Sequence, residues 1–119
     1  MPLIRVEMIE GKSKEYKKTV LDCIHDSLLD TLNIEDWDRL QRIIEIKKDD
    51  FEKPNGKSDD FMIIEVTMFK GRLKDQKRAL IEGITAMLNK RLQIAPTDVF
   101  IVIHEPPDEN WGLAGKQRG

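Results

Sequence analysis

The chain repeats itself. Shifting the 119-residue sequence by 60 positions aligns residues 3–38 with residues 63–98 without a gap, and 11 of the 36 aligned positions are identical. The identical pairs combine a glycine with lysines and apolar positions, namely Ile4/Ile64, Val6/Val66, Met8/Met68, Gly11/Gly71, Lys14/Lys74, Lys17/Lys77, Ile24/Ile84, Leu28/Leu88, Leu32/Leu92, Ile34/Ile94 and Asp38/Asp98. Two unrelated amphipathic segments would share apolar spacing only. We therefore interpret the chain as a tandem repeat, which limits it to folds built from two similar units.

Each copy has the pattern of a strand, a helix and a second strand. Residues Leu3–Ile9 alternate between apolar and charged side chains, which is the period of a strand. After Gly11, apolar residues recur every three or four positions between Val20 and Leu32, which is the period of a helix. Residues Leu40–Lys47 follow as a second predicted strand. The second copy predicts a strand over Met62–Phe69, a helix over Lys74–Leu92 and a strand over Val99–His104.

The two units predict one α/β domain over residues 1–119. Unit one covers 2–47, a charged loop 48–60, unit two 61–105 and an irregular tail 106–119. A crossover of this length joins parallel strands with a right-handed connection. Two such units give a four-stranded mixed sheet with both helices on one face. The other, half-apolar face stays uncovered, so we expect a homo-oligomer.

Composition and charge exclude several classes of function. The 20 basic and 22 acidic residues give a net charge of −2 and are scattered, which does not suit a nucleic-acid surface. The longest apolar runs fall far short of the roughly 20 residues of a membrane span, and the N-terminus lacks a secretion signal. One cysteine and two histidines predict neither a disulfide nor a zinc site. We expect a cytoplasmic protein without a metal.

Pro2 is the first candidate for chemistry. If Met1 is removed, the chain begins with a secondary amine that acts as a base or nucleophile when it is unprotonated. A free α-amino group has a pKa of about 8, and apolar surroundings or nearby cations lower that pKa. The structural alternative is that proline begins an edge strand, where its missing N–H is harmless. The residue type alone favours this structural interpretation.

Four other residues are candidates for a site. Lys70 and Arg72 lie on either side of a glycine after the third predicted strand, where two cations could hold a carboxylate. Asp38, before the second strand, could bind substrate or orient a water, while its repeat partner Asp98 equally favours a turn-capping role. Trp111 is an aromatic residue in a polar tail, where it either walls a pocket or fills a gap in the core.

Four stretches of the chain together resemble the tautomerase superfamily, in particular malonate semialdehyde decarboxylases and their relatives, in which two short β-α-β units are fused. They are PLIRVEMIEGKS, the turn DRLQ, GKSDDFMIIEVTMFKGR and PTDVFIVIHEPPDENWG. The resemblance covers nearly the whole chain. It implies the tautomerase (MIF-like) fold, a homotrimer, and catalysis by an amino-terminal proline without a metal or organic cofactor.

The resemblance also assigns roles to residues of this chain. It implies that Pro2 and Asp38 are catalytic and that Arg72 binds a substrate carboxylate. Lys70 stands where decarboxylases carry a second arginine, and Trp111 matches a tail tryptophan, so we place both with the substrate-binding residues. The implied reaction on small oxo acids is tautomerisation if the Pro2 amine is neutral, and decarboxylation or hydration if it is protonated. The alternative is a non-catalytic ferredoxin-like module that binds a ligand or partner.

Overall fold

The computed structural model describes residues 2–119 and confirms the predicted α/β fold. The main elements are β1 (Leu3–Ile9), α1 (Lys14–Leu32), β2 (Leu40–Ile46), β3 (Met62–Thr67), α2 (Lys74–Leu92) and β4 (Val99–His104). Both helices agree with the sequence prediction, whereas β2 and β3 end slightly earlier than expected. The loop between the units contains a single 3-10 turn over Lys48–Asp50.

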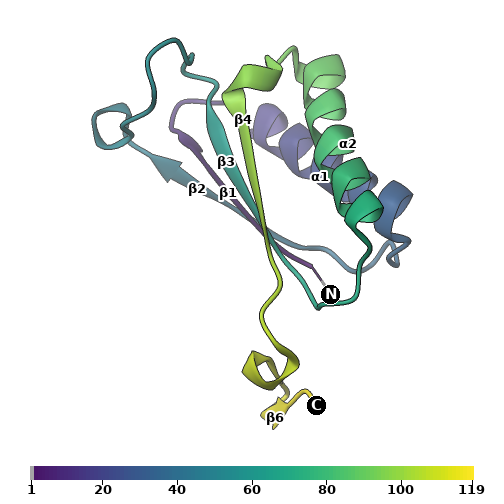
Figure 1. Cartoon of the computed structure of the whole chain (residues 1–119). Coiled ribbons are helices and arrows are strands. Elements are labelled where there is room, and N and C mark those ends of the chain that lie inside the picture. The colour runs from purple at the N-terminus through teal and green to yellow at the C-terminus, as the bar shows by residue number, and fades with distance from the viewer. Residues whose placement is uncertain (1) are drawn as a thin grey trace.

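The four long strands form one mixed sheet in the order β2-β1-β3-β4. Each unit contributes a parallel pair, and the two units meet through antiparallel β1 and β3. Figure 1 shows both helices on one face of this sheet. The antiparallel register pairs Leu3 with Thr67, so the beginning of the chain lies beside the point where β3 ends.

The hydrophobic core fills the space between the sheet and the two helices. Ile4, Val6 and Met8 of β1 are buried there, as their alternation in the sequence predicts. The apolar stripes of α1 and α2 cover them and the corresponding residues of β3. Helix α1 is capped by Ser13, whose hydroxyl accepts a 3.0 Å hydrogen bond from the Tyr16 amide.

The opposite face of the sheet is uncovered in the single chain. Leu40, Ile44 and Phe100 keep 47%, 39% and 54% of their surface exposed, although all three are large and apolar. The strand registers place them on the face away from the helices, together with Arg5 and Glu65, whose charged groups lie 3.8 Å apart. An exposed surface of this kind marks an interaction site.

The tail is more ordered than the sequence predicts. A 3-10 turn over Asp108–Asn110 leads into a small hairpin of β5 (Gly112–Leu113) and β6 (Lys116–Gln117), which Figure 1 shows below the main sheet. Ala114 and Gly115 make the turn with φ values of 54° and 79°, the backbone that matches the strand twist. Two-residue strands give too little alternation to be recognised in a sequence. Neither helix of the described chain is long and apolar enough to cross a membrane.

Candidate active site

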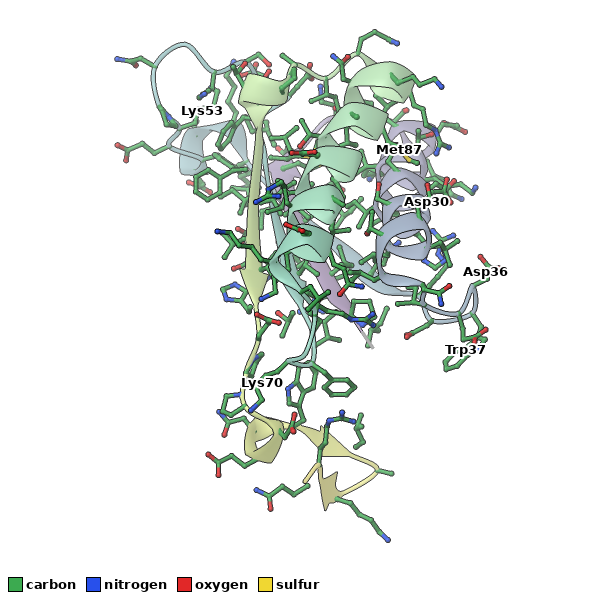
Figure 2. All side chains as sticks on the ribbon, turned by 45° about the vertical axis from the view of Figure 1, so that its right-hand side comes forward. Asp30, Asp36, Trp37, Lys53, Lys70 and Met87 are labelled. Carbon is green, nitrogen blue, oxygen red and sulfur yellow. The ribbon has the colours of Figure 1, made fainter. Side chains whose placement is uncertain are left out.

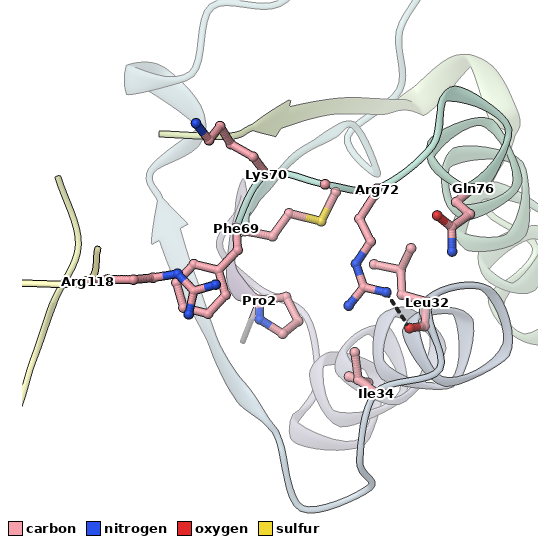
Figure 3. Close-up of a pocket in the computed structure, with 10 residues that line it drawn as sticks. Pro2, Leu32, Ile34, Phe69, Lys70, Arg72, Gln76 and Arg118 are labelled. Carbon is pink, nitrogen blue, oxygen red and sulfur yellow. Dashed lines mark hydrogen bonds between the residues drawn. The ribbon is translucent and has the colours of Figure 1, made fainter. Parts of the chain in front are cut away.

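Pro2 opens into a cavity of about 310 Å³ at one end of the sheet. The antiparallel pairing of β1 with β3 places Pro2 beside Met68 and the turn that follows it. The described residues lining this cavity come from both units and from the tail: Pro2, Leu32, Ile34, Met68, Phe69, Lys70, Gly71, Arg72, Gln76 and Arg118. Figure 3 shows Pro2 between the side chains of Phe69 and Arg72.

The surroundings of Pro2 are apolar and positively charged. Pro2 is buried, and Leu32, Ile34, Met68 and Phe69 form apolar parts of the wall. Three cationic side chains line the same cavity, and none of its described lining residues is acidic. Burial and neighbouring cations both disfavour the protonated form of an amine. Met1 lies outside the described residues, so the expected removal of this methionine stays a prediction.

Arg72 is held in place by the end of helix α1. Its Nη1 donates a 2.7 Å hydrogen bond to the carbonyl oxygen of Leu32, the last residue of that helix, as Figure 3 shows. Carbonyl groups in the last turn of a helix have no partner within the helix and carry its partial negative charge. Arg72 reaches this position from a turn in which Gly71 has a φ of 118°, a backbone suited to glycine.

The structure places two other predicted substrate-binding residues at the edge of the site. Lys70 lines the cavity, but it is exposed and Figure 3 shows its ammonium group directed away from Pro2. Trp111 is not among the described lining residues; its ring packs edge-on against Phe69 with 4.6 Å between the ring centres. Its indole nitrogen donates to the carbonyl oxygen of Pro106 at 3.2 Å. Trp111 thus supports the wall from behind.

Asp38 lies at the same end of the sheet, outside the cavity lining. The parallel register pairs Leu3 with Leu40, which brings the segment before β2 near the start of β1. Asp38 is half-buried there, yet the described lining residues do not include it. Its neighbour Arg39 donates a 2.9 Å hydrogen bond to Asp22 of α1, which holds the pKa of that carboxyl below its usual value and ties the segment down.

The opposite end of the sheet carries the repeat-related cavity, of about 340 Å³. Gly11 and Lys12 take the places of Gly71 and Arg72, but Lys12 is paired with the carboxylate of Asp60. Lys48 lies 2.8 Å from Asp59, and this contact lowers the pKa of the Asp59 carboxyl. The cations at this end are therefore neutralised by acidic residues of the loop between the units.

Tyr16 of the first unit and Asp98 of the second unit both lie near the loop between the units. The Tyr16 hydroxyl is buried without a described hydrogen-bond partner, and burial, followed by the charges of Asp60 and Asp98, raises its pKa to about 12. Asp98 accepts from the Ser58 amide at 2.9 Å and from its hydroxyl at 2.6 Å, which fits the structural role that its position predicts. The repeat partner of Pro2 is Met62, whose nitrogen is an amide within β3.

Sequence reasoning did not identify several of the lining residues, of which Phe69 and Arg118 lie beside Pro2. Phe69 directly precedes the cationic turn, a position that could have drawn attention. Arg118 belongs to the tail. The local signal for the hairpin that precedes Arg118 is the turn-prone pair Ala114-Gly115. Cys23 and His25 lie elsewhere: both are buried side chains of α1, burial raises the pKa of the Cys23 thiol, and His25 contacts Asp36 at 3.2 Å.

Two observations concern the molecule outside this cavity. Within residues 2–119, no three His, Cys, Asp or Glu side chains are arranged to hold a metal ion. Figure 2 shows Asp36 and Trp37 projecting from the segment between α1 and β2. Trp37 is 75% exposed and forms no part of the described cavity lining.

Comparison with known proteins gives consistent results for the whole chain. Two family models, both described as tautomerase enzyme, match residues 38–114 and 2–52. The probable tautomerase YusQ of Bacillus subtilis (strain 168) is 27% identical over 118 residues, covering 95% of this chain and 93% of YusQ.

Solved structures share the fold over nearly the full length. FG41 malonate semialdehyde decarboxylase inhibited by 3-bromopropiolate is 28% identical and superposes with a TM-score of 0.84 over 94% of this chain and 88% of the other. The R7 fused 4-OT wild type, an asymmetric trimer, has a TM-score of 0.85 at 21% identity, over 97% of this chain and 94% of the other. The fold and both family matches lead to one conclusion: this chain belongs to the tautomerase family.

Proposed function

We propose that this protein is a cofactor-independent tautomerase of small oxo acids, with the amino-terminal nitrogen of Pro2 as its base. The observation that carries the proposal is the burial of Pro2 in a cavity lined by Lys70, Arg72 and Arg118, with no acidic residue among its described walls. This environment favours the neutral amine, the form that accepts a proton. Removal of Met1 is part of the proposal, since an amide nitrogen cannot act as a base.

The proton moves between two atoms of the substrate. In ketonisation, the Pro2 nitrogen takes the proton of the enol hydroxyl and the oxygen becomes a carbonyl. The nitrogen then gives the proton to the other carbon atom of the C=C bond, the one that does not carry the oxygen. The guanidinium of Arg72 binds the substrate carboxylate and stabilises the negative charge that develops on the oxygen. Lys70 adds positive potential at the mouth, Trp111 supports the wall, and Asp38 orients a polar group of the substrate or a water.

Decarboxylation is a second candidate, favoured by the 28% identity with FG41 malonate semialdehyde decarboxylase. In that reaction a protonated Pro2 polarises the carbonyl of a 3-oxo acid while the carboxylate leaves as carbon dioxide. The pKa of Pro2 separates the two reactions. A titration of the ¹⁵N-labelled Pro2 nitrogen by NMR distinguishes them: tautomerisation requires a pKa well below that of an ordinary α-amino group, and decarboxylation requires a pKa that is not lowered.

The remaining expectations belong to the same proposal. The uncovered face with Leu40, Ile44 and Phe100 supports a homotrimer, as does the trimeric state of the fused 4-OT neighbour. A cytoplasmic location remains part of the proposal.

The test measures ketonisation of the enol of phenylpyruvate after intact-mass measurement of the chain. We expect a chain without Met1, and Pro2→Ala should lower kcat/KM by about 10²-fold or more. Pro54→Ala, in the exposed loop between the units, serves as the matched control and should retain the rate. Equal rates for Pro2→Ala and the wild type, or a fully retained Met1 in an active protein, would remove Pro2 from the mechanism.

A further inference from the structure

Asp38 belongs to a segment that apolar packing holds only weakly. In the connection between α1 and β2, Ile34 and Asp38 are half-buried and the other residues are exposed. Figure 2 shows this connection projecting from the body of the protein at Asp36 and Trp37. A segment with so few buried apolar contacts opens readily unless polar contacts fix it. The place of the Asp38 carboxylate therefore depends on the polar contacts of this connection.

Two tethers, one on either side of Asp38, join the segment to α1. Before Asp38, the carboxylate of Asp36 lies 3.2 Å from Nε2 of His25. After Asp38, Nη2 of Arg39 donates a 2.9 Å hydrogen bond to the carboxylate of Asp22. Asp22 and His25 are three positions apart in α1, so they are neighbours on its surface. Both ends of a short turn are thus attached to one rigid helix.

The tether from His25 is fixed by the burial of its ring. The side chain of His25 is 1% exposed, and close packing prevents such a ring from turning away. A carboxylate oxygen accepts hydrogen bonds, so Nε2 of His25 is the donor in the contact with Asp36. Nδ1 is buried without a described hydrogen-bond partner. The place of Asp36 in the exposed turn is therefore determined by the packing of α1.

The turn between the tethers carries their position to Asp38. The amide of Asp38 donates a 3.0 Å hydrogen bond to the carbonyl oxygen of Glu35, which closes the turn. The parallel register pairs Leu3 with Leu40, so the turn ends beside Pro2 at the start of the sheet. A movement of the turn changes the distance between the Asp38 carboxylate and the Pro2 cavity.

We propose that the two tethers hold Asp38 at its working position, so that the residues that form them are positioning residues for the reaction. This inference rests on the proposed function for the role of Asp38, and it adds residues of α1 that contact neither Pro2 nor the cavity. Loss of a tether should lower kcat more than it raises KM, because Arg72, on a separate turn, binds the substrate carboxylate.

The test removes each tether through its partner in the turn. Asp36→Ala and Arg39→Gln should each lower kcat for phenylpyruvate enol by about threefold or more, and the double variant by about tenfold or more. KM should stay within about twofold of the wild-type value. The midpoint of thermal unfolding should stay near that of the wild type, since exposed ion pairs add little stability. Hydrogen exchange at the Asp38 amide should become faster.

Arg91→Gln is the matched control, because it breaks an ion pair of the same kind on the same helix. Arg91 of α2 donates a 3.0 Å hydrogen bond to Asp26, which lies one helical turn after Asp22. This contact is remote from the connection between α1 and β2. Arg91→Gln should therefore keep the wild-type kcat and the wild-type exchange rate of the Asp38 amide.

A double-mutant cycle shows whether the tethers act through Asp38. Asp38→Asn should lower kcat, and adding Asp36→Ala or Arg39→Gln to it should cause no further loss. Wild-type kcat in the variant without both tethers, an equal loss in Arg91→Gln, or a full additional loss in the Asp38→Asn background would each overturn the proposal and leave the role of Asp38 intact. Wild-type kcat in Asp38→Asn would instead remove Asp38 from the proposed mechanism, and the tethers with it.

Discussion

Arg72 of the second unit donates a hydrogen bond to the carbonyl oxygen of Leu32 at the end of helix α1 in the first unit, at 2.7 Å. This contact joins the two repeats at the end of the sheet that carries the Pro2 cavity. Its counterpart in the repeat, Lys12, pairs with Asp60 of the loop between the units. The same position thus lines a cavity at each end of the sheet, and at the end away from Pro2 its charge is paired with an acidic residue.

Replacement of Arg72 should lower activity, whereas replacement of its repeat partner Lys12 should not. Arg72→Gln removes the charged partner of the substrate carboxylate, and kcat/KM for phenylpyruvate enol should fall by about 10- to 100-fold, mostly through KM. Lys12→Gln at the repeat-related position should leave steady-state kinetics unchanged. A similar loss in both variants would indicate a general effect on folding, and no loss in Arg72→Gln would exclude it from substrate binding.

Alanine at Gly71 should harm both stability and activity. The φ of 118° is strained for a residue with a Cβ, so Gly71→Ala should lower the free energy of unfolding by about 1–3 kcal/mol in urea titration. Because the turn relaxes, Arg72 should also move away from Pro2 and activity should drop.

The matched control is Gly11→Ala, since Gly11 has a φ of 113° in the same turn of the first unit. It should cost similar stability and leave the kinetics of the folded protein unchanged. If both variants lose activity to the same degree, activity does not depend on the position of the turn at the Pro2 end.

Tyr16 should make stability depend on alkaline pH. It is the single tyrosine of the chain, and burial raises its pKa to about 12. The folded state retains this proton up to a higher pH than the unfolded state, whose tyrosine ionises near 10. The free energy of unfolding should therefore fall as pH rises from about 10 towards 12.

The phenolate absorbance at 295 nm reports this ionisation directly. The wild type should titrate near pH 12, and Tyr16→Phe should show no phenolate signal and a weaker alkaline loss of stability. Since the hydroxyl is buried without a described partner, Tyr16→Phe should not destabilise the protein at neutral pH. A titration midpoint near 10 in the folded protein would contradict the burial of this group.

The uncovered sheet face should control assembly. Light scattering of the wild type should give three times the 13.8 kDa of one chain. Phe100→Asp places a charge in the middle of the proposed interface and should yield a smaller species. Leu73→Asp alters an apolar residue just before α2 that is even more exposed than Phe100, and it should leave the mass unchanged. A wild-type mass of one chain would contradict the trimer.

Most of the architecture was predictable because it follows from local periodicity. The alternation of Leu3–Ile9 identifies both the strand and its buried face, and the apolar stripe between Val20 and Leu32 identifies the helix and the side that packs. Because the internal repeat shows the same strand and helix patterns a second time, each prediction was supported by two segments of the chain. The tail hairpin escaped prediction, since two-residue strands are stabilised by contacts such as Phe69 with Trp111.

The order of elements, the repeat and the two cationic turns follow from local patterns, because spacings of two and 3.6 residues depend only on neighbours along the chain. Tertiary packing settles which of the two turns faces Pro2. The antiparallel pairing of β1 with β3 puts the chain start beside Arg72, while the loop between the units supplies Asp60 to Lys12. It also decided that Arg118 lines that cavity, since this depends on the folding of distant segments against one another.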